Sequence, residues 1–488
     1  MAGSTREHAD DPHASLGGAC PRVGRTVTEY DAVVVGSGPN GLAAAVTLAR
    51  AGLAVHVVEG APTPGGGCRT EEITLPGFHH DVCSAAHPLL ALSPFFADPA
   101  FDGLRSRLVH PDVPFAHPLD GGGAVAAHRS LDATVDELGP DGPAYRRLIG
   151  PLADHAAALA DGVLAPVRRV PRHPATMARF GRTGVRSLDG LVRRFEGEAA
   201  PALLAGAAAH AVRPLSAPPT AGFALVLTAA AHAVGWPVLA GGSAAVTEAL
   251  VAELERLGGT LETGRWVQAV DELPRSTAVV LDVAPAALPG LVGDRLPPGY
   301  GRRLARFRSG PGVCKVDWAL SGPVPWTAEV AAAEAAVGAG RHPERPFCIV
   351  VQPGVADPTR APDGARTLWA YCHVPYGSDR DMADAVEAQV ERFAPGFGDL
   401  VLARRTVTAA RLGDTNPNEA GGDIGGGANT LAQTLFRPVP AWNPYRTPVD
   451  GVYLCSSSTP PGGGVHGMCG VHAARTVLHD RFGGPPPV

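Results

Sequence analysis

The first ordered pattern in the chain is a short apolar run that predicts a buried strand. Residues 30–35 read YDAVVV, which is typical of a parallel strand covered on both faces. An alanine-rich helical stretch follows at 42–51, and Gly52 is placed to end it. A second apolar run, AVHVV, occupies 54–58. Together these residues predict one right-handed βαβ unit.

Hydrophobic periodicity predicts helices in the middle of the chain and strands on either side of them. Helical patterns occur at 145–160 and 188–211, within a segment rich in Ala, Leu and Arg. Residues 244–257 predict an amphipathic helix that two glycines terminate. Strands are expected at 260–273, 278–282, 313–320, 367–373 and 451–455. The last of these leads through a loop of Ser, Thr, Pro and Gly into a helix that begins near His466.

Charge and cysteine content narrow the class of protein. The chain has 41 basic and 47 acidic side chains without a basic block, which argues against a nucleic-acid partner. Its 8 cysteines form no Cys-x-x-Cys pair, so reduced thiols and a cytoplasmic location are expected rather than a disulfide framework. The most apolar stretch, 221–234, is shorter than the roughly 18 residues of a membrane span.

Glycines mark the turn between the first strand and the first helix. The residues of this turn are Gly36, Ser37, Gly38, Pro39, Asn40 and Gly41. Glycine lets the backbone turn tightly and approach a pyrophosphate, whose charge then lies at the N-terminus of the following helix. Glu59, at the end of the second strand, is placed to accept hydrogen bonds from an adenosine ribose. These features predict a dinucleotide site; the alternative is an ordinary glycine turn.

A second group of glycines distinguishes between FAD and NAD, which share the first motif. Gly65, Gly66, Gly67 and Arg69 follow Glu59 and predict a second loop that approaches the ligand closely. Such a loop suits a large two-ringed cofactor that lies extended across the domain, whereas a flexible loop is the alternative. FAD is therefore the expected cofactor. Because the chain offers one complete βαβ nucleotide site, NADH and NADPH are not expected as stoichiometric partners.

These motifs resemble those of the phytoene desaturase-like FAD-dependent oxidoreductases in the amine oxidase superfamily. The segments that carry the resemblance are 36–41, 59–72, 76–88, 238–242, 422–424 and 459–470, and they extend over nearly the whole chain. More narrowly, the chain is similar to the subgroup named for a pyridine nucleotide-disulphide oxidoreductase domain, although it has no redox-active cysteine pair. It departs from the amine oxidases at Gly67, where an arginine often follows two glycines.

The resemblance implies further cofactor contacts. Val267 matches a valine whose backbone touches the adenine. The loop with Gly464, Val465, His466 and Gly467 is expected to face the flavin pyrimidine ring, where a helix N-terminus stabilises the negative charge of reduced flavin. The loop also has the spacing of a dinucleotide turn, but no βαβ partner strand follows it, so a second nucleotide is not expected.

Lys315 is the only lysine in the chain, and its surroundings are similar to the amine-oxidase strand whose lysine holds a water at flavin N5. Arginine cannot replace an ammonium in such a compact site. The alternatives are a surface lysine or one that satisfies a buried neighbour such as Asp317. His373, Tyr376 and Arg213 are further candidates for the substrate cavity, but no motif assigns proton transfer to them.

Metal ligation is not expected at either group of histidines. His79 and His80 are adjacent and would point to opposite faces of a strand. His466, Cys469 and His472 are spaced by three residues, and the flavin-facing helix accounts for them.

The expected organisation is an α/β fold with a Rossmann-like FAD-binding domain and a discontinuous α+β substrate domain. Since 488 residues exceed what one hydrophobic core usually covers, two domains are expected. The FAD-binding domain is expected at 29–110, 235–290 and 430–488, the substrate or cap domain at 111–234 and 291–429, and a disordered leader at 1–28.

The reaction implied is dehydrogenation, or desaturation, of a C–C bond in a small apolar substrate such as an isoprenoid or secondary metabolite. Flavin N5 takes the hydride, and O₂ or a quinone is the expected electron acceptor. Amine oxidation is one alternative, and a non-catalytic FAD-binding interaction protein is another. Peripheral membrane contact through 151–235 is an alternative to a plain helical core. The sequence leaves the oligomeric state open.

Overall fold

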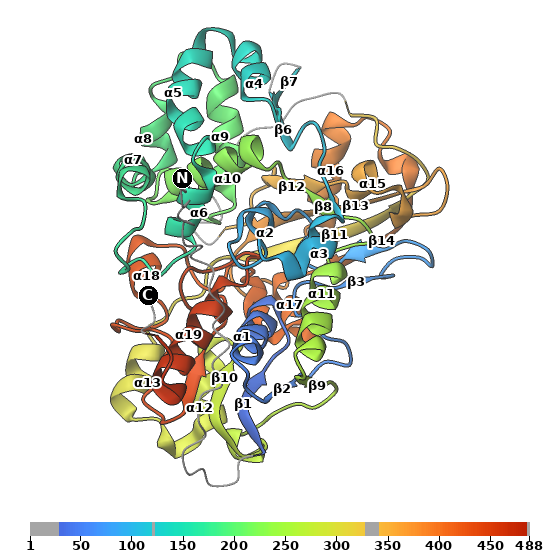
Figure 1. Cartoon of the computed structure of the whole chain (residues 1–488). Helices are drawn as coiled ribbons and strands as arrows, with labels where there is room; N and C mark the ends of the chain where they lie inside the picture. The colour runs from blue at the N-terminus through green and yellow to red at the C-terminus, as the bar shows by residue number, and fades with distance from the viewer. Residues whose placement is uncertain (1–28, 120–122, 327–340, 486–488) are drawn as a thin grey trace, which may run out of the picture.

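A parallel five-stranded sheet lies at the base of the molecule as drawn in Figure 1. The computed structural model describes residues 29–119, 123–326 and 341–485, so the expected leader at 1–28 lies outside the described residues. The strand order is β15-β10-β1-β2-β9, with all neighbours parallel. The strands are β1 (Tyr30–Val35), β2 (Val55–Val58), β9 (Thr260–Glu262), β10 (Ser276–Leu281) and β15 (Val452–Leu454).

Helices cover both faces of this sheet, which explains why its strands are apolar on both sides. One face packs against α1 (Pro39–Arg50), α11 (Ala244–Arg256) and α19 (Met468–Phe482). The other packs against α12 (Leu288–Val292) and α13 (Pro298–Leu304). Because α1 follows β1 and α19 follows β15, both helices begin at the carboxyl edge of the sheet. Two helix N-termini therefore meet at this edge.

A second, antiparallel sheet lies above the first, to the right in Figure 1. Its order is β12-β13-β11-β14, with β11 (Gly312–Leu320), β12 (Cys348–Val351), β13 (Arg366–Val374) and β14 (Val401–Val407). One face packs on α16 (Ala383–Phe393) through Cys314, Val316 and Trp318. The alternate residues of β11 and β13, including Lys315 and Tyr371, therefore lie on the opposite face.

Helices at the upper left of Figure 1 form a layer with its own hydrophobic core. They are α4 (Leu131–Glu137), α5 (Gly142–Ala153), α6 (Ala156–Val163), α7 (Pro174–Gly184), α8 (Leu188–Val192), α9 (Ala199–Ala209) and α10 (Thr220–Ala233). The hairpin of β6 (Phe115–Pro118) and β7 (Ala124–Ala127) joins this layer. In the described part of the chain, no helix combines the length and apolar character that spanning a bilayer requires.

The remaining elements are short and connect these layers. The strands are β3 (Thr70–Glu71), β4 (His80–Asp81), β5 (Leu108–Val109) and β8 (Val238–Leu239). The α-helices are α2 (Pro88–Leu92), α3 (Asp102–Arg105), α15 (Pro353–Ala356), α17 (Ala409–Thr415) and α18 (Leu431–Phe436). The 3₁₀ turns are Pro99–Phe101, Gly139–Asp141, Val270–Glu272, Pro285–Ala287, Gly293–Arg295, Pro358–Arg360 and Gly398–Leu400, and Pro417–Gly422 is irregular in its middle.

Four sequence-based element boundaries are wrong. The strand expected at 260–273 ends at Glu262, because Gly264 has a φ of +72° and turns the chain out of the sheet. The helix expected at 145–160 is two helices, α5 and α6, and the helix expected at 188–211 is also two, α8 and α9. The last helix begins at Met468 rather than near His466, since Gly467 is its N-cap with a φ of +70°. In each case local turn geometry ended a pattern that hydrophobicity alone would extend.

The packing of α1 against α19 predicts a large effect of a single methyl group. A Cβ at Gly470 would lie 1.9 Å from the carbonyl oxygen of Asn40, so Gly470→Ala must push the two helices apart. We expect a loss of about 2 kcal/mol or more in the free energy of unfolding, as overpacking typically causes, measured by urea titration. Gly181→Ala in α7 is the control, because nothing lies within 4 Å of its Cβ position. An unchanged Gly470→Ala variant would contradict this close packing.

Candidate cofactor and substrate site

A cavity of about 1790 Å³ extends from the carboxyl edge of the parallel sheet to the antiparallel sheet and the helical layer. Its lining includes these residues of the predicted dinucleotide site: Gly36, Gly38, Pro39, Asn40 and Glu59. Small-molecule pockets usually measure about 300–1000 Å³. The cavity therefore has room for a dinucleotide together with a second molecule.

The glycine turn after β1 is held by the carboxylate of Asp282, the residue that follows β10. A Cβ at Gly41 would lie 2.1 Å from the carbonyl oxygen of Gly36, so this turn requires glycine. The backbone N–H of Gly41 donates to Oδ2 of Asp282 over 2.8 Å. Burial raises the pKa of Asp282 to about 7. The sequence placed Asp282 at a strand end but did not identify it as part of the site.

Glu59 is fixed by hydrogen bonds at the point where a ribose would bind. Its Oε2 accepts from the N–H and the hydroxyl of Ser37, both over 2.7 Å, and Oε1 accepts from the N–H of Ala61 over 2.8 Å. Helix α1 begins beside it with Pro39 at its first turn and no side-chain cap on Gly38. Pro39 has no N–H and the Gly41 N–H is held by Asp282, so the Asn40 N–H is the one that the first turn leaves for an anion.

The second glycine loop touches the first. A Cβ at Gly66 would lie 3.1 Å from Cα of Gly38, so the two loops approach too closely for larger side chains. Gly65 has a φ of +125°, and its Cβ would lie 2.7 Å from Oγ1 of Thr247; Gly65 is needed for packing and is not among the cavity-lining residues. Gly66 and Gly67 do line the cavity.

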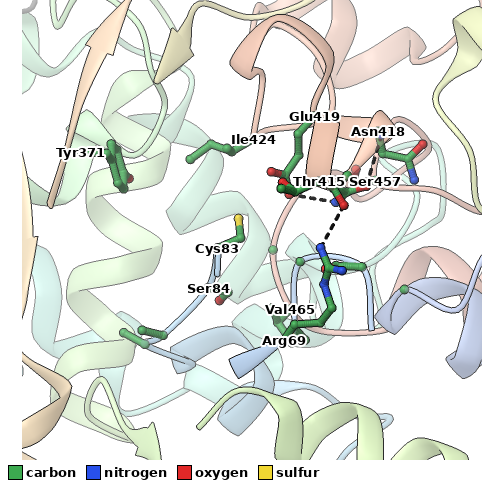
Figure 2. A pocket seen from close by; sticks show the side chains of 18 of the residues that line it. Arg69, Cys83, Ser84, Tyr371, Thr415, Asn418, Glu419, Ile424, Ser457 and Val465 are labelled. Carbon is green, nitrogen blue, oxygen red and sulfur yellow. Dashed lines mark hydrogen bonds between the residues drawn. The ribbon is translucent and has the colours of Figure 1, made fainter. Parts of the chain in front are cut away.

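Arg69 connects this loop to a distant segment. Its Nε donates to the carbonyl of Gly66 over 3.1 Å, and its NH2 group donates to the carbonyl of Thr415 over 2.9 Å, as Figure 2 shows. Arg69 lines the cavity, as does Val267, which lies in an irregular segment rather than on a strand.

Of the residues expected at the flavin, Gly464 and Val465 line the cavity, but His466 and Gly467 do not. The His466 side chain stabilises the loop instead: Nδ1 accepts from the N–H of Met468 over 3.0 Å, and Nε2 lies 3.2 Å from the carbonyl of Gly462. Burial lowers the pKa of His466 to about 4, which keeps the ring neutral. The His466 side chain thus caps the start of the helix, and a flavin contact of this loop through its backbone stays a prediction.

Lys315 is buried and satisfied by protein groups. Its Nζ pairs with the carboxylate of Asp317, donates to the carbonyl of Asp81 over 3.2 Å, and lies 5.0 Å from the ring centre of Trp369. Lys315 does not line the cavity, whereas Trp369 does. The structure thus matches the alternative in which the lysine satisfies a buried neighbour.

The other catalytic candidates also lie outside the cavity lining. Tyr376 is 52% exposed, and its ring fills the space next to Gly421. His373 is buried, with its ring centre 5.7 Å from that of Tyr371 and 6.3 Å from that of Phe347. Arg213 is likewise absent from the lining. Their sequence position next to cavity-forming strands and helices did not show which way their side chains point.

Glu419 is a lining residue that sequence reasoning missed. Figure 2 shows it on the same side of the cavity as Ile424, which lies between it and Tyr371, with Cys83 below. Its Oε1 accepts from Nδ2 of Asn416 over 2.9 Å, and the Cys83 thiol also donates to the carboxyl group. Burial raises the pKa of Glu419. The neighbouring segment 422–424 is part of the family resemblance, but Glu419 lies in a loop and belongs to no recognisable motif.

The far part of the cavity, which we call the cap chamber, is formed by β6, α9, β12, β13 and α16. Its apolar lining includes Phe115, Trp236, Phe347, Ile349, Val351 and Phe393. The imidazoles and amides of its lining belong to His117, His210, Gln352 and Gln389. No Asp, Glu, Lys or Arg from these five elements is among the described lining residues.

Comparison with known proteins identifies relatives of the whole chain. Residues 34–96 match the model of the NAD(P)-binding Rossmann-like domain. Pyridine nucleotide-disulfide oxidoreductase domain-containing protein 2 of Mus musculus is 28% identical, with 94% of each chain covered, and the Rattus norvegicus protein is 29% identical. The chain is thus similar to these pyridine nucleotide-disulfide oxidoreductase domain-containing proteins over nearly its whole length. The resemblance predicted from the sequence is confirmed.

Solved structures show the same fold. An oxidoreductase from Methanosarcina mazei has a TM-score of 0.60 at 16% identity, covering 92% of this chain and 100% of its own. Cyclohexylamine oxidase from Brevibacterium oxydans has a TM-score of 0.55 at 16% identity, covering 92% and 99%. The fold is that of FAD-binding amine oxidases. The predicted Rossmann-like fold is thus confirmed, and the predicted oxidoreductase class and FAD cofactor agree with these relatives and with the fold.

The fixed position of Glu59 predicts that Glu59→Gln weakens FAD retention. An amide group would place N–H donors against the N–H groups of Ser37 or Ala61, and it would remove a charged acceptor. We expect an FAD dissociation constant about tenfold higher or more, the scale of a charge-assisted hydrogen bond, measured by flavin fluorescence on dilution. Glu248→Gln on the exposed face of α11 is the control. Equal retention in the two variants would contradict the role of Glu59.

The Lys315–Asp317 pair predicts a stability defect that a second substitution repairs. Lys315→Met leaves the Asp317 carboxylate buried without its ammonium, and we expect a loss of about 3–5 kcal/mol in the free energy of unfolding. The double variant Lys315→Met/Asp317→Asn should recover most of this, as denaturant titration would show. A stable double variant that carries FAD but reoxidises slowly with O₂ would instead support a lysine-held water at the flavin.

Proposed function

We propose that the protein is an FAD-dependent dehydrogenase that desaturates a C–C bond of an apolar substrate held in the cap chamber. The observation that carries this proposal is the composition of that chamber, whose described lining has aromatic and aliphatic side chains and no ionic group. A limonene dehydrogenase component from Castellaniella defragrans, which is 33% identical over 23% of this chain, adds support, because its name gives an apolar hydrocarbon as substrate.

The residues around the glycine loops fit FAD. The close approach of Gly66 to Gly38 keeps side chains out of the turn, and the Asn40 N–H at the start of α1 suits a pyrophosphate. Glu59 would hold the ribose, and Val267 would lie at the adenine. Bound FAD supplies a hydride acceptor at N5. The start of α19, near Gly464, would stabilise negative charge on the reduced ring.

An apolar substrate fits the cap chamber better than a charged amine. An ammonium that enters the chamber loses its water, and burying such a charge without a partner is costly. Among the described lining residues the chamber offers no carboxylate to pair with it. Amine oxidation is the second candidate, since putrescine oxidase bound to putrescine has this fold with a TM-score of 0.56.

Glu419 is our candidate for the group that accepts the substrate proton. Its carboxyl lines the cavity beside Cys83, and Arg69 and Lys315 lie close enough to influence its charge. A raised pKa makes a carboxylate a stronger base, and general bases work best when their pKa is near the working pH. The hydrogen bond from Asn416 fixes its orientation.

Anaerobic mixing of the purified holoprotein with candidate substrates tests the proposed reaction. We expect saturated isoprenoids or host lipid extracts to bleach the flavin and to yield a product with one more C=C bond and no ammonia. Reoxidation by O₂ and by a quinone would then identify the electron acceptor. Bleaching by amines alone, with release of ammonia, would favour amine oxidation, and the absence of any bleaching would favour a non-catalytic FAD-binding protein.

The proton-accepting role predicts that Glu419→Gln slows flavin reduction by about 10²–10⁴-fold, the usual contribution of a general base. Wild-type reduction should rise with pH as Glu419 ionises, because the raised pKa moves this step to higher pH than for an ordinary glutamate. The variant should lose this pH dependence while its FAD content stays normal.

Asp414→Asn is the matched control for Glu419→Gln. Asp414 also lines the cavity, but its carboxylate pairs with Arg411, which is largely exposed. Stopped-flow reduction should therefore be nearly unchanged in this variant. If Glu419→Gln keeps the wild-type rate and pH profile of flavin reduction, Glu419 is not the proton acceptor, and solvent must take the proton.

A further inference from the structure

His210 presents a hydrogen-bond acceptor to the cap chamber. It is the C-cap residue of α9, and its edge meets Trp236 with ring centres 5.3 Å apart and planes at 89°. The side chain is half-buried, and it is part of the cavity lining. Its position is therefore fixed by packing while part of its ring remains accessible from the chamber.

The hydrogen bond of Nδ1 determines the tautomer of His210. Nδ1 lies 3.3 Å from the carbonyl oxygen of Ala207, and because a carbonyl only accepts, Nδ1 must carry the proton. Burial lowers the pKa of His210 to about 4, so the ring is neutral at physiological pH. Nε2 then has a lone pair; the ring makes its hydrogen bond from Nδ1 to Ala207, and the backbone carbonyl of Gly206 also lies near it.

The surroundings of His210 restrict the group that Nε2 can receive. Phe115 packs on the other side of Trp236, with ring centres 4.6 Å apart, and Phe347 also lines the chamber. Within the described lining, the chamber offers no lysine or arginine for a carboxylate and no carboxylate for an ammonium. The described residues also form no cluster that could hold a metal ion. A neutral hydrogen-bond donor remains.

We infer that His210 Nε2 accepts a hydrogen bond from a hydroxyl group of the substrate, so that the substrate is an apolar molecule carrying one hydroxyl. This rests on the proposed function only in taking the cap chamber as the substrate site. With its hydroxyl anchored at His210, the substrate is oriented in the cavity, and this determines which of its carbon atoms lie near Glu419.

Binding of matched probes to the holoprotein tests this inference without requiring turnover. The probes are n-decanol and methyl n-decyl ether, which share an apolar chain and an ether or hydroxyl oxygen but differ in the O–H donor. Quenching of tryptophan fluorescence reports binding, since Trp236 and Trp369 line the cavity. We expect the alcohol to bind about three- to tenfold more tightly than the ether, the range of one neutral hydrogen bond. Equal affinities would overturn the inference.

Two substitutions locate the effect at Nε2. His210→Phe should abolish the preference for the alcohol while leaving ether binding nearly unchanged, and His210→Gln, whose amide oxygen can accept, should restore part of it. His173→Phe, at an exposed position, is the control for losing an imidazole. A His210→Phe variant that keeps the full preference would overturn the inference, and so would a folded His210→Gln variant that shows none.

The same measurements separate this inference from the proposed reaction. Holoprotein that prefers the alcohol through His210 but is not reduced by any saturated compound would support the hydroxyl site and contradict the dehydrogenation. Holoprotein that desaturates hydrocarbons yet binds alcohol and ether equally would support the dehydrogenation and overturn the hydroxyl site.

Discussion

Close approach of backbone to backbone at the carboxyl edge of the parallel sheet is the constraint on which the rest of the structure depends. Gly36, Gly41 and Asp282 meet there at distances that exclude any further Cβ atom, and the Asp282 carboxylate closes the turn by accepting from Gly41. The contact of α1 with α19 at Gly470 is equally close and also leaves no room for a Cβ atom. These contacts set where two helix N-termini open, and hence where an anionic cofactor can lie.

A buried ionic network then attaches the substrate region to this edge. Arg360 pairs with both Asp81 and Asp357 over 3.1 and 2.8 Å, and the Asp81 carbonyl also receives Lys315, which pairs with Asp317. Such pairs cost desolvation free energy and contribute little net stability, but breaking one leaves an uncompensated charge. Their effect is to fix the antiparallel sheet at one position relative to the glycine loops.

The sequence was sufficient where the residues that interact lie close together along the chain. The glycines at 36–41 and Glu59 lie within one βαβ unit, so spacing alone predicted that they meet at one turn. It was insufficient where partners lie far apart along the chain: Lys315 was linked to the flavin by resemblance and Asp317 was named as its alternative partner, but its contact with the Asp81 carbonyl, 234 residues away, had no signal in the sequence. Glu419 was missed for the same reason, since its neighbour Cys83 comes from the other end of the chain.

Glu419 and His210, two of the titratable groups that line the cavity, suit different tasks because burial shifts their pKa values in opposite directions. Burial raises the pKa of Glu419 and lowers that of His210, so each is driven toward its neutral form. A carboxyl group moved this way becomes a stronger base, whereas an imidazole becomes a fixed neutral acceptor. A cavity with the base at its cofactor end and the acceptor at its apolar end would orient a substrate by its hydroxyl and deprotonate it elsewhere. The enzyme would then select substrates that carry a hydroxyl. A substrate without a hydrogen-bond donor would leave the buried Nε2 unpaired, which costs binding free energy.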